Sequence, residues 1–334
     1  MMVAPGLLRE GGAGPVAIRA LAHAWAGRRR VRWRVMSDAS VRMHADEVTV
    51  DAALVSRLIA AQCAPWTGRS LTRIRHAGTD NAMFRLGDGL VVRLPRIGWA
   101  ADDVHKEATW LPRLAPHLPL RVPEPLFVGV PGEGYPFPWA VYRWLEGVDA
   151  GLDTVRDGHE LARELAGFIM ALRRVPRPPD APHGSRNGTL HDRDRGTRAA
   201  IADCAGLLDA APVLAAWEAA LTVPAWAGDH MWIHGDLKPG NLLAHGGRLS
   251  AVIDWGGLTL GDPAVDLQPA WNLLDAPSRQ SFRAALEVDD ATWARGRGWA
   301  LSVSLVALPY YVHTNPELAA ICRATIRAVL DEGF

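Results

Sequence analysis

Hydrophobic and polar residues alternate along the first part of the chain in a way that predicts a small antiparallel sheet. Apolar residues follow Asp51 at helical spacing, which favours a first helix capped by this carboxylate. Five strand-like segments follow, at residues 71–78, 81–88, 90–96, 126–130 and 139–147. The turn at residues 87–89 favours a hairpin, and the apolar positions around Glu107 predict one helix inserted after the third strand.

The spacing of apolar residues then becomes helical. Helices are expected at residues 157–174, 190–203, 211–221, 263–274, 278–287, 290–308 and 316–331. Two short apolar segments flank Gly246-Gly247 and predict a tight hairpin among these helices. The expected fold class is therefore α+β, with a sheet-containing part at residues 43–147 and a mainly helical part at residues 148–334.

Residues 1–42 differ from the rest because they are rich in Gly, Ala and Arg. We expect a disordered leader or a mis-assigned start here, and a basic arm that binds nucleic acid is the alternative. The chain of 334 residues carries 36 basic and 36 acidic side chains. Because this charge is balanced, we expect no nucleic-acid partner.

The longest apolar run near the C-terminus, residues 299–312, is too short to span a bilayer and contains Pro309. It predicts a buried helix, and no membrane partner is expected. The three cysteines are Cys63, Cys204 and Cys322. They are odd in number and far apart, which fits a reducing compartment, so a cytoplasmic location is expected.

Lysine is almost absent, because only Lys106 and Lys238 are lysines among the 36 basic residues. Arginine is therefore expected at positions where lysine is the more usual cation. Lys106 lies on the helix that contains Glu107, and we interpret it as a surface charge.

The segment HGDLKPGN, residues 234–241, carries the clearest chemical signal. It matches the kinase catalytic-loop pattern H-x-D-x-x-x-x-N. In phosphoryl transfer, Asp236 would accept the proton of the attacking hydroxyl. Lys238 would reach the transferred phosphate as a point charge, and the side-chain oxygen of Asn241 would bind Mg²⁺.

The predicted hairpin follows this loop and leads to Ile253-Asp254-Trp255-Gly256. Kinases carry D-F-G at this place, and its aspartate binds the metal. A hairpin returns the chain to its starting point, so we expect Asp254 to lie beside Asn241. Both residues would then hold the same Mg²⁺ ion.

Four motifs in order resemble the aminoglycoside phosphotransferase family, which has a protein-kinase-like two-lobe fold. These motifs are HGDxxxxN, the IDW that contains Asp254, GDPAVDL at residues 261–267 and VYRWLEG at residues 141–147. The resemblance covers roughly residues 45–330 and implies a small-molecule kinase. It implies ATP or GTP and Mg²⁺ as cofactors, and a small molecule with a hydroxyl group as acceptor.

The resemblance also implies roles for residues outside the catalytic chemistry. Asp266 would brace the catalytic loop, and His234 would support it structurally. The segment between the lobes would meet the purine through its backbone, at Arg143, Trp144 and Leu145.

The N-terminal part departs from the kinase pattern in two ways. It has no G-x-G-x-x-G, and the stretch that contains Gly78 and Asn81 resembles a shorter turn that covers the phosphates. Arg93 stands where a kinase usually has lysine paired with a helix glutamate, here Glu107. Arginine binds phosphates too, with a different reach and geometry.

Two other functions remain open at this point. A nucleotide-binding pseudokinase that acts by binding partners is the alternative that Arg93 favours. A protein kinase is disfavoured, because Gly235 replaces the usual arginine and no APE-like segment follows residues 254–257. Members of the resembled family act on aminoglycosides, macrolides and other alcohols, and the sequence contains no readable code for the acceptor.

Overall fold

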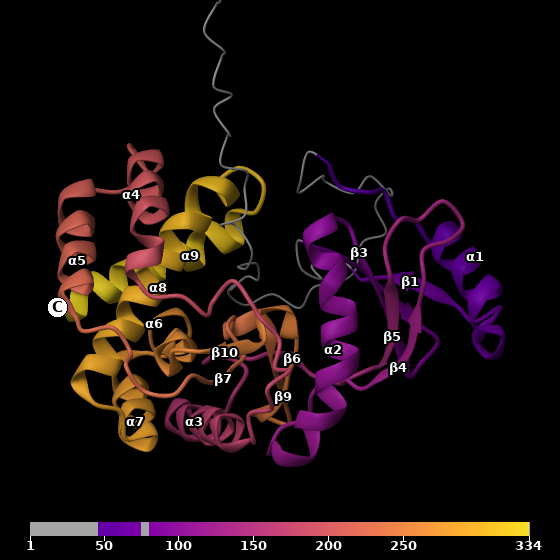
Figure 1. Ribbon diagram of the computed structural model, residues 1–334, viewed down its shortest axis with the longest axis horizontal. Helices are drawn as coiled ribbons and strands as arrows, with labels where there is room; N and C mark the ends of the chain where they lie inside the picture. The colour runs from indigo at the N-terminus through magenta and orange to yellow at the C-terminus, as the bar shows by residue number, and fades with distance from the viewer. Residues whose placement is uncertain (1–45, 75–79, 334) are drawn as a thin grey trace, which may run out of the picture.

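The computed structural model describes residues 46–74 and 80–333 (Figure 1). The predicted leader at residues 1–42 and the predicted phosphate contact Gly78 therefore lie outside the described residues. A sheet-containing part lies beside a larger helical part (Figure 1). We call residues 46–147 the N-lobe and residues 148–333 the C-lobe.

The N-lobe is built on an antiparallel sheet of five strands with the order β1-β2-β3-β5-β4. The strands are β1 (Leu71–Arg73), β2 (Asn81–Leu86), β3 (Leu90–Pro95), β4 (Pro125–Gly129) and β5 (Trp139–Arg143). The predicted sheet is confirmed, but β5 ends at Arg143 rather than at residue 147. The backbone N–H of Trp144 instead donates to the carbonyl of Gly89, 2.9 Å away, as the chain leaves the sheet.

Two helices flank this sheet (Figure 1). Helix α1 (Ala52–Gln62) lies on its outer side and begins with the predicted cap, because Asp51 accepts a 2.7 Å hydrogen bond from the backbone of Leu54. Helix α2 (Ala101–Leu114) follows β3, as predicted, and lies between the sheet and the C-lobe. It can therefore carry side chains into the space between the lobes.

The C-lobe is mainly helical, as predicted. Its helices are α3 (Gly158–Arg174), α4 (Asp194–Asp203), α5 (Ala210–Thr222), α6 (Pro269–Asn272), α7 (Ala276–Leu286), α8 (Asp290–Tyr311) and α9 (Pro316–Glu332). The single helix predicted at residues 263–274 is wrong. A 3-10 turn, Pro263–Leu267, precedes the short α6, because Pro269 has no N–H to donate to the carbonyl of Val265, which accepts from Gln268 Nε2 at 2.9 Å instead.

Short strands position the loops of the C-lobe. The predicted hairpin is present as β8 (Leu242–His245) and β9 (Arg248–Val252), and β6 (Val148–Asp149) extends it. Strand β7 (Met231–Ile233) pairs with β10 (Thr259–Gly261). Sequence periodicity did not predict β6 or β10, because two or three residues contain no readable alternation.

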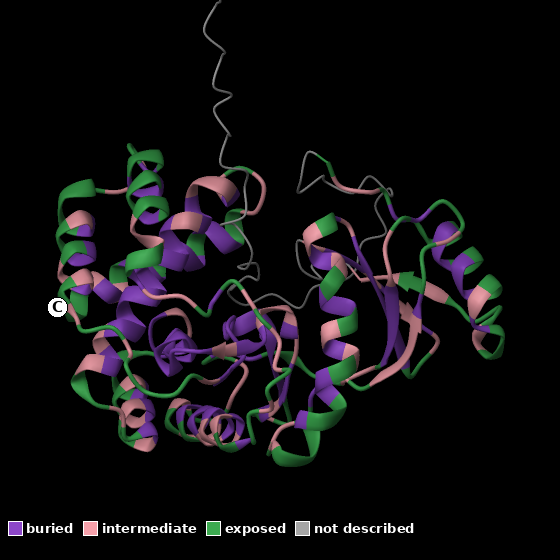
Figure 2. Cartoon of the chain, in the orientation of Figure 1, coloured by how far each residue is buried: buried purple, intermediate pink, exposed green. Residues whose placement is uncertain are grey.

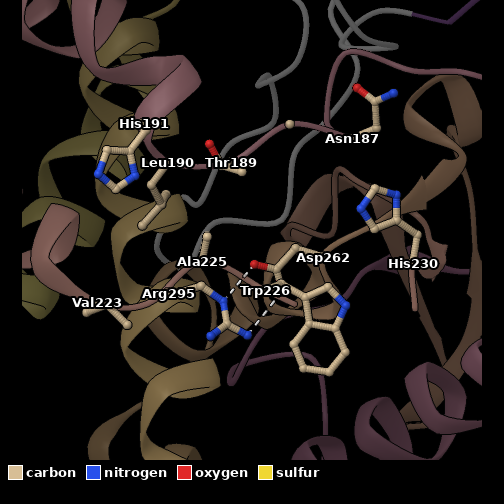
Figure 3. Close-up of a pocket in the computed structure, with 11 residues that line it drawn as sticks. Asn187, Thr189, Leu190, His191, Val223, Ala225, Trp226, His230, Asp262 and Arg295 are labelled. Atoms are coloured by element: carbon tan, nitrogen blue, oxygen red, sulfur yellow. Dashed lines mark hydrogen bonds and ion pairs between the residues drawn. The ribbon is translucent and has the colours of Figure 1, made fainter. Parts of the chain in front are cut away.

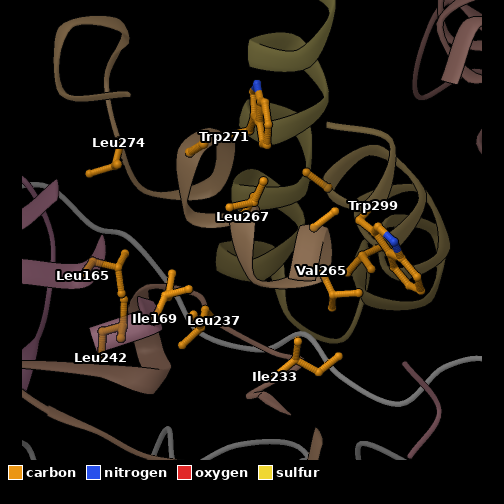
Figure 4. Close-up of a cluster of buried hydrophobic side chains, with 14 of the residues drawn as sticks. Leu165, Ile169, Ile233, Leu237, Leu242, Val265, Leu267, Trp271, Leu274 and Trp299 are labelled. Atoms are coloured by element: carbon orange, nitrogen blue, oxygen red, sulfur yellow. The ribbon is translucent and has the colours of Figure 1, made fainter. Parts of the chain in front are cut away.

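The core of the C-lobe surrounds these strands (Figure 2). Figure 4 shows Leu165 and Ile169 of α3 near Leu237 and Leu242, so the loop between β7 and β8 is anchored in the core. Helix α8 is buried over most of its length, as the apolar run at residues 299–312 predicts. Across residues 46–74 and 80–333, none of the helices combines the length and the apolar character needed to cross a membrane.

Candidate active site

The loop from His234 to Asn241 connects β7 to β8 with a backbone that needs glycine at one position. Gly235 has φ +82°, and a Cβ on it would lie 2.6 Å from the carbonyl oxygen of Gly257. Neither the dihedral angle nor the space suits another residue. Leu237 is 1% exposed, so the loop is held by an apolar side chain between Asp236 and Lys238.

His234 and Asp266 hold this loop in place through hydrogen bonds to its backbone. The Asp266 carboxylate accepts hydrogen bonds from the backbone N–H groups of His234 and Gly235, each at 2.8 Å. The His234 Nδ1 accepts from the N–H of Asp236 at 3.2 Å, so its Nε2 donates to the carbonyl of Ile253 at 3.1 Å. Burial lowers the pKa of His234, which keeps the ring neutral. Both residues make the contacts of loop supports.

The Asp236 carboxylate has one oxygen engaged and one available. Its Oδ2 accepts from Lys238 Nζ and, at 2.8 Å, from Asn241 Nδ2. Its Oδ1 is buried without a hydrogen-bond partner among the described residues. Burial raises the pKa of Asp236, and the Lys238 ammonium works against this rise. An oriented carboxylate oxygen that accepts no hydrogen bond from the protein is suited to accept one from a substrate hydroxyl.

Asn241 and Asp254 lie at the two ends of the hairpin, as expected. The backbone N–H of Ile253 donates to the carbonyl of Asn241 at 2.9 Å. The Asn241 Nδ2 donates to the Asp236 carbonyl at 2.8 Å, and only an amide nitrogen can do so. The Asn241 side-chain oxygen therefore points away from Asp236. Asp254 has φ +63°, a strained conformation for a residue with a side chain, and its side chain is 41% exposed.

These two oxygen donors fit a magnesium ion. The part of the chain that the structure describes has no group of three or more His, Cys, Asp or Glu residues able to hold a metal. Mg²⁺ commonly takes one or two protein oxygens and completes its shell with water and substrate phosphates. Asn241 and Asp254 would therefore hold Mg²⁺ only when a phosphate ligand helps to complete its coordination shell.

Arg93 occupies the position of the usual kinase lysine and connects the two lobes. Its guanidinium forms ion pairs with Glu107 of α2 and, at 3.4 Å, with Asp254. The Glu107 carboxylate also accepts from Tyr142 Oη at 2.7 Å and from the backbone of Trp255 at 3.0 Å. Burial acts to lower the pKa of Arg93, but the charges of Glu107 and Asp254 outweigh it and raise this pKa above its usual value.

Lys106 is not the surface charge that its position on α2 suggested. Its side chain is 12% exposed, and its Nζ donates to the carbonyl of Gly256. It also pairs with Asp103 at 3.1 Å, three residues earlier on the helix. Lys106 therefore fixes α2 against the turn that follows Asp254, which a helical pattern alone cannot reveal.

Three residues between the lobes are predicted to meet a purine, and two of them already use their backbone N–H groups. The N–H groups of Arg143 and Trp144 are used inside the N-lobe, since they donate to Glu124 at 3.0 Å and to Gly89 at 2.9 Å. The exposed Arg143 side chain pairs with the Glu124 carboxylate at 2.6 Å. The backbone N–H of Leu145, by contrast, has no such backbone partner among the described residues.

Asn81, the other predicted phosphate contact, begins β2 and is 9% exposed. Its side-chain oxygen is buried without a hydrogen-bond partner among the described residues. The Asn81 side-chain oxygen is therefore available to accept a hydrogen bond at the start of β2.

Arg186 is a residue of the site that the sequence analysis missed. It lies on the loop between α3 and α4 and is 4% exposed. Its Cγ would lie 3.3 Å from a Cβ on Gly235. Burial lowers the pKa of Arg186, and the charge of Asp236 acts in the opposite direction. No motif marks Arg186, because only the folded loop brings it to the catalytic segment.

A small cavity lies at the far end of β7 from the catalytic loop (Figure 3). It has a volume of about 30 Å³, which is room for only one or two water molecules. Asp262 and Arg295 meet at its wall with a 2.7 Å ion pair. The cavity is too small to take a sugar-sized acceptor.

Comparisons with known proteins agree with this geometry. A sequence model of the phosphotransferase enzyme family, APH, matches residues 71–299. No curated protein matches the chain by sequence. Similar solved structures include the GDP and kanamycin complex of APH(2")-IIia, with a TM-score of 0.68 and 20% identity over 84% of this chain and 99% of that chain.

Two macrolide enzymes also share the fold. Macrolide 2'-phosphotransferase type I has a TM-score of 0.58 and 20% identity, and covers 84% of this chain and 98% of its own. The apoenzyme of macrolide 2'-phosphotransferase MphH from Brachybacterium faecium has a TM-score of 0.54 and 23% identity, with the same two coverages of 84% and 98%. At these identities the structural likeness shows a shared fold, and the acceptors of these enzymes differ in chemistry.

Proposed function

The chain belongs to the phosphotransferase enzyme family, and from this premise we propose that it transfers the terminal phosphoryl group of ATP or GTP to a hydroxyl group of a small molecule. The observation that carries the proposal is the Asp236 carboxylate, with one oxygen held by Lys238 and Asn241 and the other buried without a partner among the described residues. The GDP and kanamycin bound to the similar APH(2")-IIia support a nucleotide donor and a hydroxylated acceptor.

The proposed reaction is an in-line displacement at phosphorus. The acceptor oxygen forms a bond to the terminal phosphorus while the bond to the bridging oxygen breaks. The bridging oxygen keeps that electron pair and leaves as part of the nucleoside diphosphate. The proton of the acceptor hydroxyl moves to Asp236 Oδ1, and Lys238 and Asn241 keep the carboxylate in position.

The other predicted residues take roles around the nucleotide. Asn241 and Asp254 would hold Mg²⁺, which supplies positive charge to the phosphate oxygens when bound. Arg93 and Lys238 would contact the phosphates, and Asn81 would contribute its side chain at their cover. Leu145 would meet the purine edge through its backbone, because the N–H groups of Arg143 and Trp144 already have partners.

The test is nucleoside diphosphate release, with Mg²⁺, across a panel of hydroxylated acceptors. We expect Asp236→Asn to lower turnover by a factor of roughly 10²–10⁴, because the variant cannot accept the proton. Nucleotide affinity, measured by calorimetry, should stay close to that of the parent. Turnover at the parental rate in Asp236→Asn, at unchanged fold by circular dichroism, would remove Asp236 from the proposed role.

A second function, a nucleotide-binding pseudokinase that acts by binding, is favoured by Arg93 alone. Arginine at this position has two carboxylate partners, Glu107 and Asp254. The same assay separates the two functions. Tight binding of Mg²⁺-nucleotide without diphosphate release for any acceptor, at high enzyme concentration, would favour the binding protein.

A further inference from the structure

Two adjacent side chains of α2 bind the backbone of the turn that follows Asp254. The Glu107 carboxylate accepts from the N–H of Trp255 at 3.0 Å, and the Lys106 ammonium donates to the carbonyl of Gly256. The two contacts have opposite polarity, so they satisfy one backbone donor and one backbone acceptor of the same turn. A helix of the N-lobe therefore holds the C-lobe segment that carries a predicted metal ligand.

Helix α2 is in direct contact with this turn. A Cβ on Gly256 would lie 2.8 Å from Asp103 Oδ2, so only glycine allows the approach. Asp103 is buried and pairs with Lys106 at 3.1 Å. The two residues are three positions apart and lie on the same face of the helix. The ion pair thus restrains the Lys106 side chain beside the carbonyl that it binds.

The conformation of Asp254 depends on such contacts. Its φ of +63° lies in the left-handed region, which a residue with a side chain keeps only where its neighbours hold it. Before Asp254, the N–H of Ile253 donates to the Asn241 carbonyl at 2.9 Å, and the Ile253 carbonyl accepts from His234 at 3.1 Å. After Asp254, the turn is bound by α2, and Lys106 supplies one of these bonds.

We propose that Lys106 is a positioning residue for metal binding. By holding the Gly256 carbonyl, it keeps the Asp254 carboxylate where it can share Mg²⁺ with Asn241. Mg²⁺ demands near-ideal octahedral geometry, so a small displacement of one ligand weakens its binding. This inference rests on the proposed function and on its two metal ligands, and it adds a residue that touches neither nucleotide nor metal.

The charge of Lys106 makes the direction of the effect diagnostic. A cation near a metal site repels the metal ion, so charge alone predicts that Lys106→Met binds Mg²⁺ more tightly. Positioning predicts the opposite, because the Asp254 carboxylate loses its fixed place. Weaker metal binding after removal of a positive charge therefore has no electrostatic explanation.

The test measures how much Mg²⁺ strengthens nucleotide binding. ADP and, in parallel, GDP are titrated into the full chain by calorimetry, once with saturating Mg²⁺ and once with EDTA. The ratio of the two Kd values is the metal gain, and it cancels any general damage to the nucleotide site. We expect Lys106→Met to lower the metal gain roughly 10-fold and to leave the Kd in EDTA at the parental value.

Three variants serve as controls. Arg113→Met removes a positive charge from the same helix, but Arg113 pairs with Asp180 at the surface, so its metal gain should equal that of the parent. Lys106→Arg keeps the charge and the donor and should retain most of the gain. The double variant Asp103→Asn with Lys106→Met leaves no buried carboxylate without its cation. It should fold even where Lys106→Met does not, and it should show the same loss of gain.

The outcomes separate the two proposals. A metal gain in Lys106→Met or in the double variant that equals or exceeds the parental gain would overturn the positioning role, whether or not the chain releases nucleoside diphosphate. A gain that depends on Lys106, in a chain that releases no diphosphate with any acceptor, would support the positioning role and remove the phosphotransferase function. A parent without any metal gain would overturn both the positioning role and the proposed metal ligands.

Discussion

At the residue scale, the neighbours of the proposed catalytic carboxylate determine how readily it ionises. Asp236 is buried, and burial disfavours its ionised form, while Lys238 and Arg186 favour it. Lys238 is one of two lysines in the chain, and its ammonium contacts Asp236 Oδ2 directly. In the proposed mechanism, Lys238 would thus tune the base as well as contact a phosphate, a second role that the motif alone does not specify.

Lys238→Met should move the acid limb of the pH–activity profile to higher pH. The proposed base works in its ionised form, so activity falls as the pH drops through the pKa of Asp236. Removing the cation that lowers this pKa raises it further, and the loss begins at a higher pH. The measurement is kcat as a function of pH between about 5 and 9, a range that covers the titration of catalytic carboxylates with a raised pKa.

Lys238→Arg is the control for this profile, because it retains the positive charge. Its acid limb should stay closer to that of the parent, even where kcat itself falls. An acid limb at the same pH in the parent and in Lys238→Met would show that Lys238 does not tune Asp236.

At the element scale, short motifs and regular elements were predictable to different extents. The five-stranded sheet and the hairpin at Gly246-Gly247 follow from local patterns, because alternation and turn chemistry act within a few residues. The helix predicted at residues 263–274 is instead a 3-10 turn followed by the short α6, which begins at Pro269, a residue without an N–H to continue the ladder from residue 265. The strands β6 and β10 form by pairing with segments distant in the sequence, and no local pattern can predict such pairing.

Gly235→Ala should destabilise the fold by about 3 kcal/mol or more. The added methyl group meets the backbone of Gly257, and φ +82° is strained for alanine. Gly246→Ala is the matched control, because Gly246 also has a positive φ, +62°, but no atom lies within 4 Å of the new methyl group.

Urea unfolding of both variants separates steric overlap from dihedral strain. We expect Gly246→Ala to cost about 1–2 kcal/mol, the strain alone. Equal losses in the two variants would mean that the contact between the catalytic loop and Gly257 relaxes without cost.

At the scale of the whole molecule, a buried ion-pair cluster joins the lobes. Arg93 comes from the sheet, Glu107 from α2 and Asp254 from the turn after the hairpin, and the first and last are 161 positions apart. The sequence pattern indicates Arg93 and Glu107 as a pair, but their burial, at 6% and 1% exposure, is a property of the fold. Lys106 adds a second contact from α2 to the same turn.

Arg93→Met should lower the free energy of unfolding by about 3 kcal/mol, because it leaves Glu107 buried without its cation. The double variant Arg93→Met with Glu107→Gln should recover part of this loss, since the uncompensated charge is removed. Urea unfolding of the parent, both single variants and the double variant gives the coupling. Additive losses would show that the two side chains do not act as a pair.

The sequence by itself determined the reaction class, the fold class and the order of the proposed catalytic residues. The physical reason is that one contiguous loop carries Asp236, Lys238 and Asn241, and a tight hairpin returns Asp254 to them. Only the tertiary structure decided which oxygen of Asp236 is available, that Lys106 bonds to the turn after Asp254, and that Arg186 adjoins the catalytic loop. Those features depend on burial and on contacts between distant loops, and neither leaves a periodic trace along the chain.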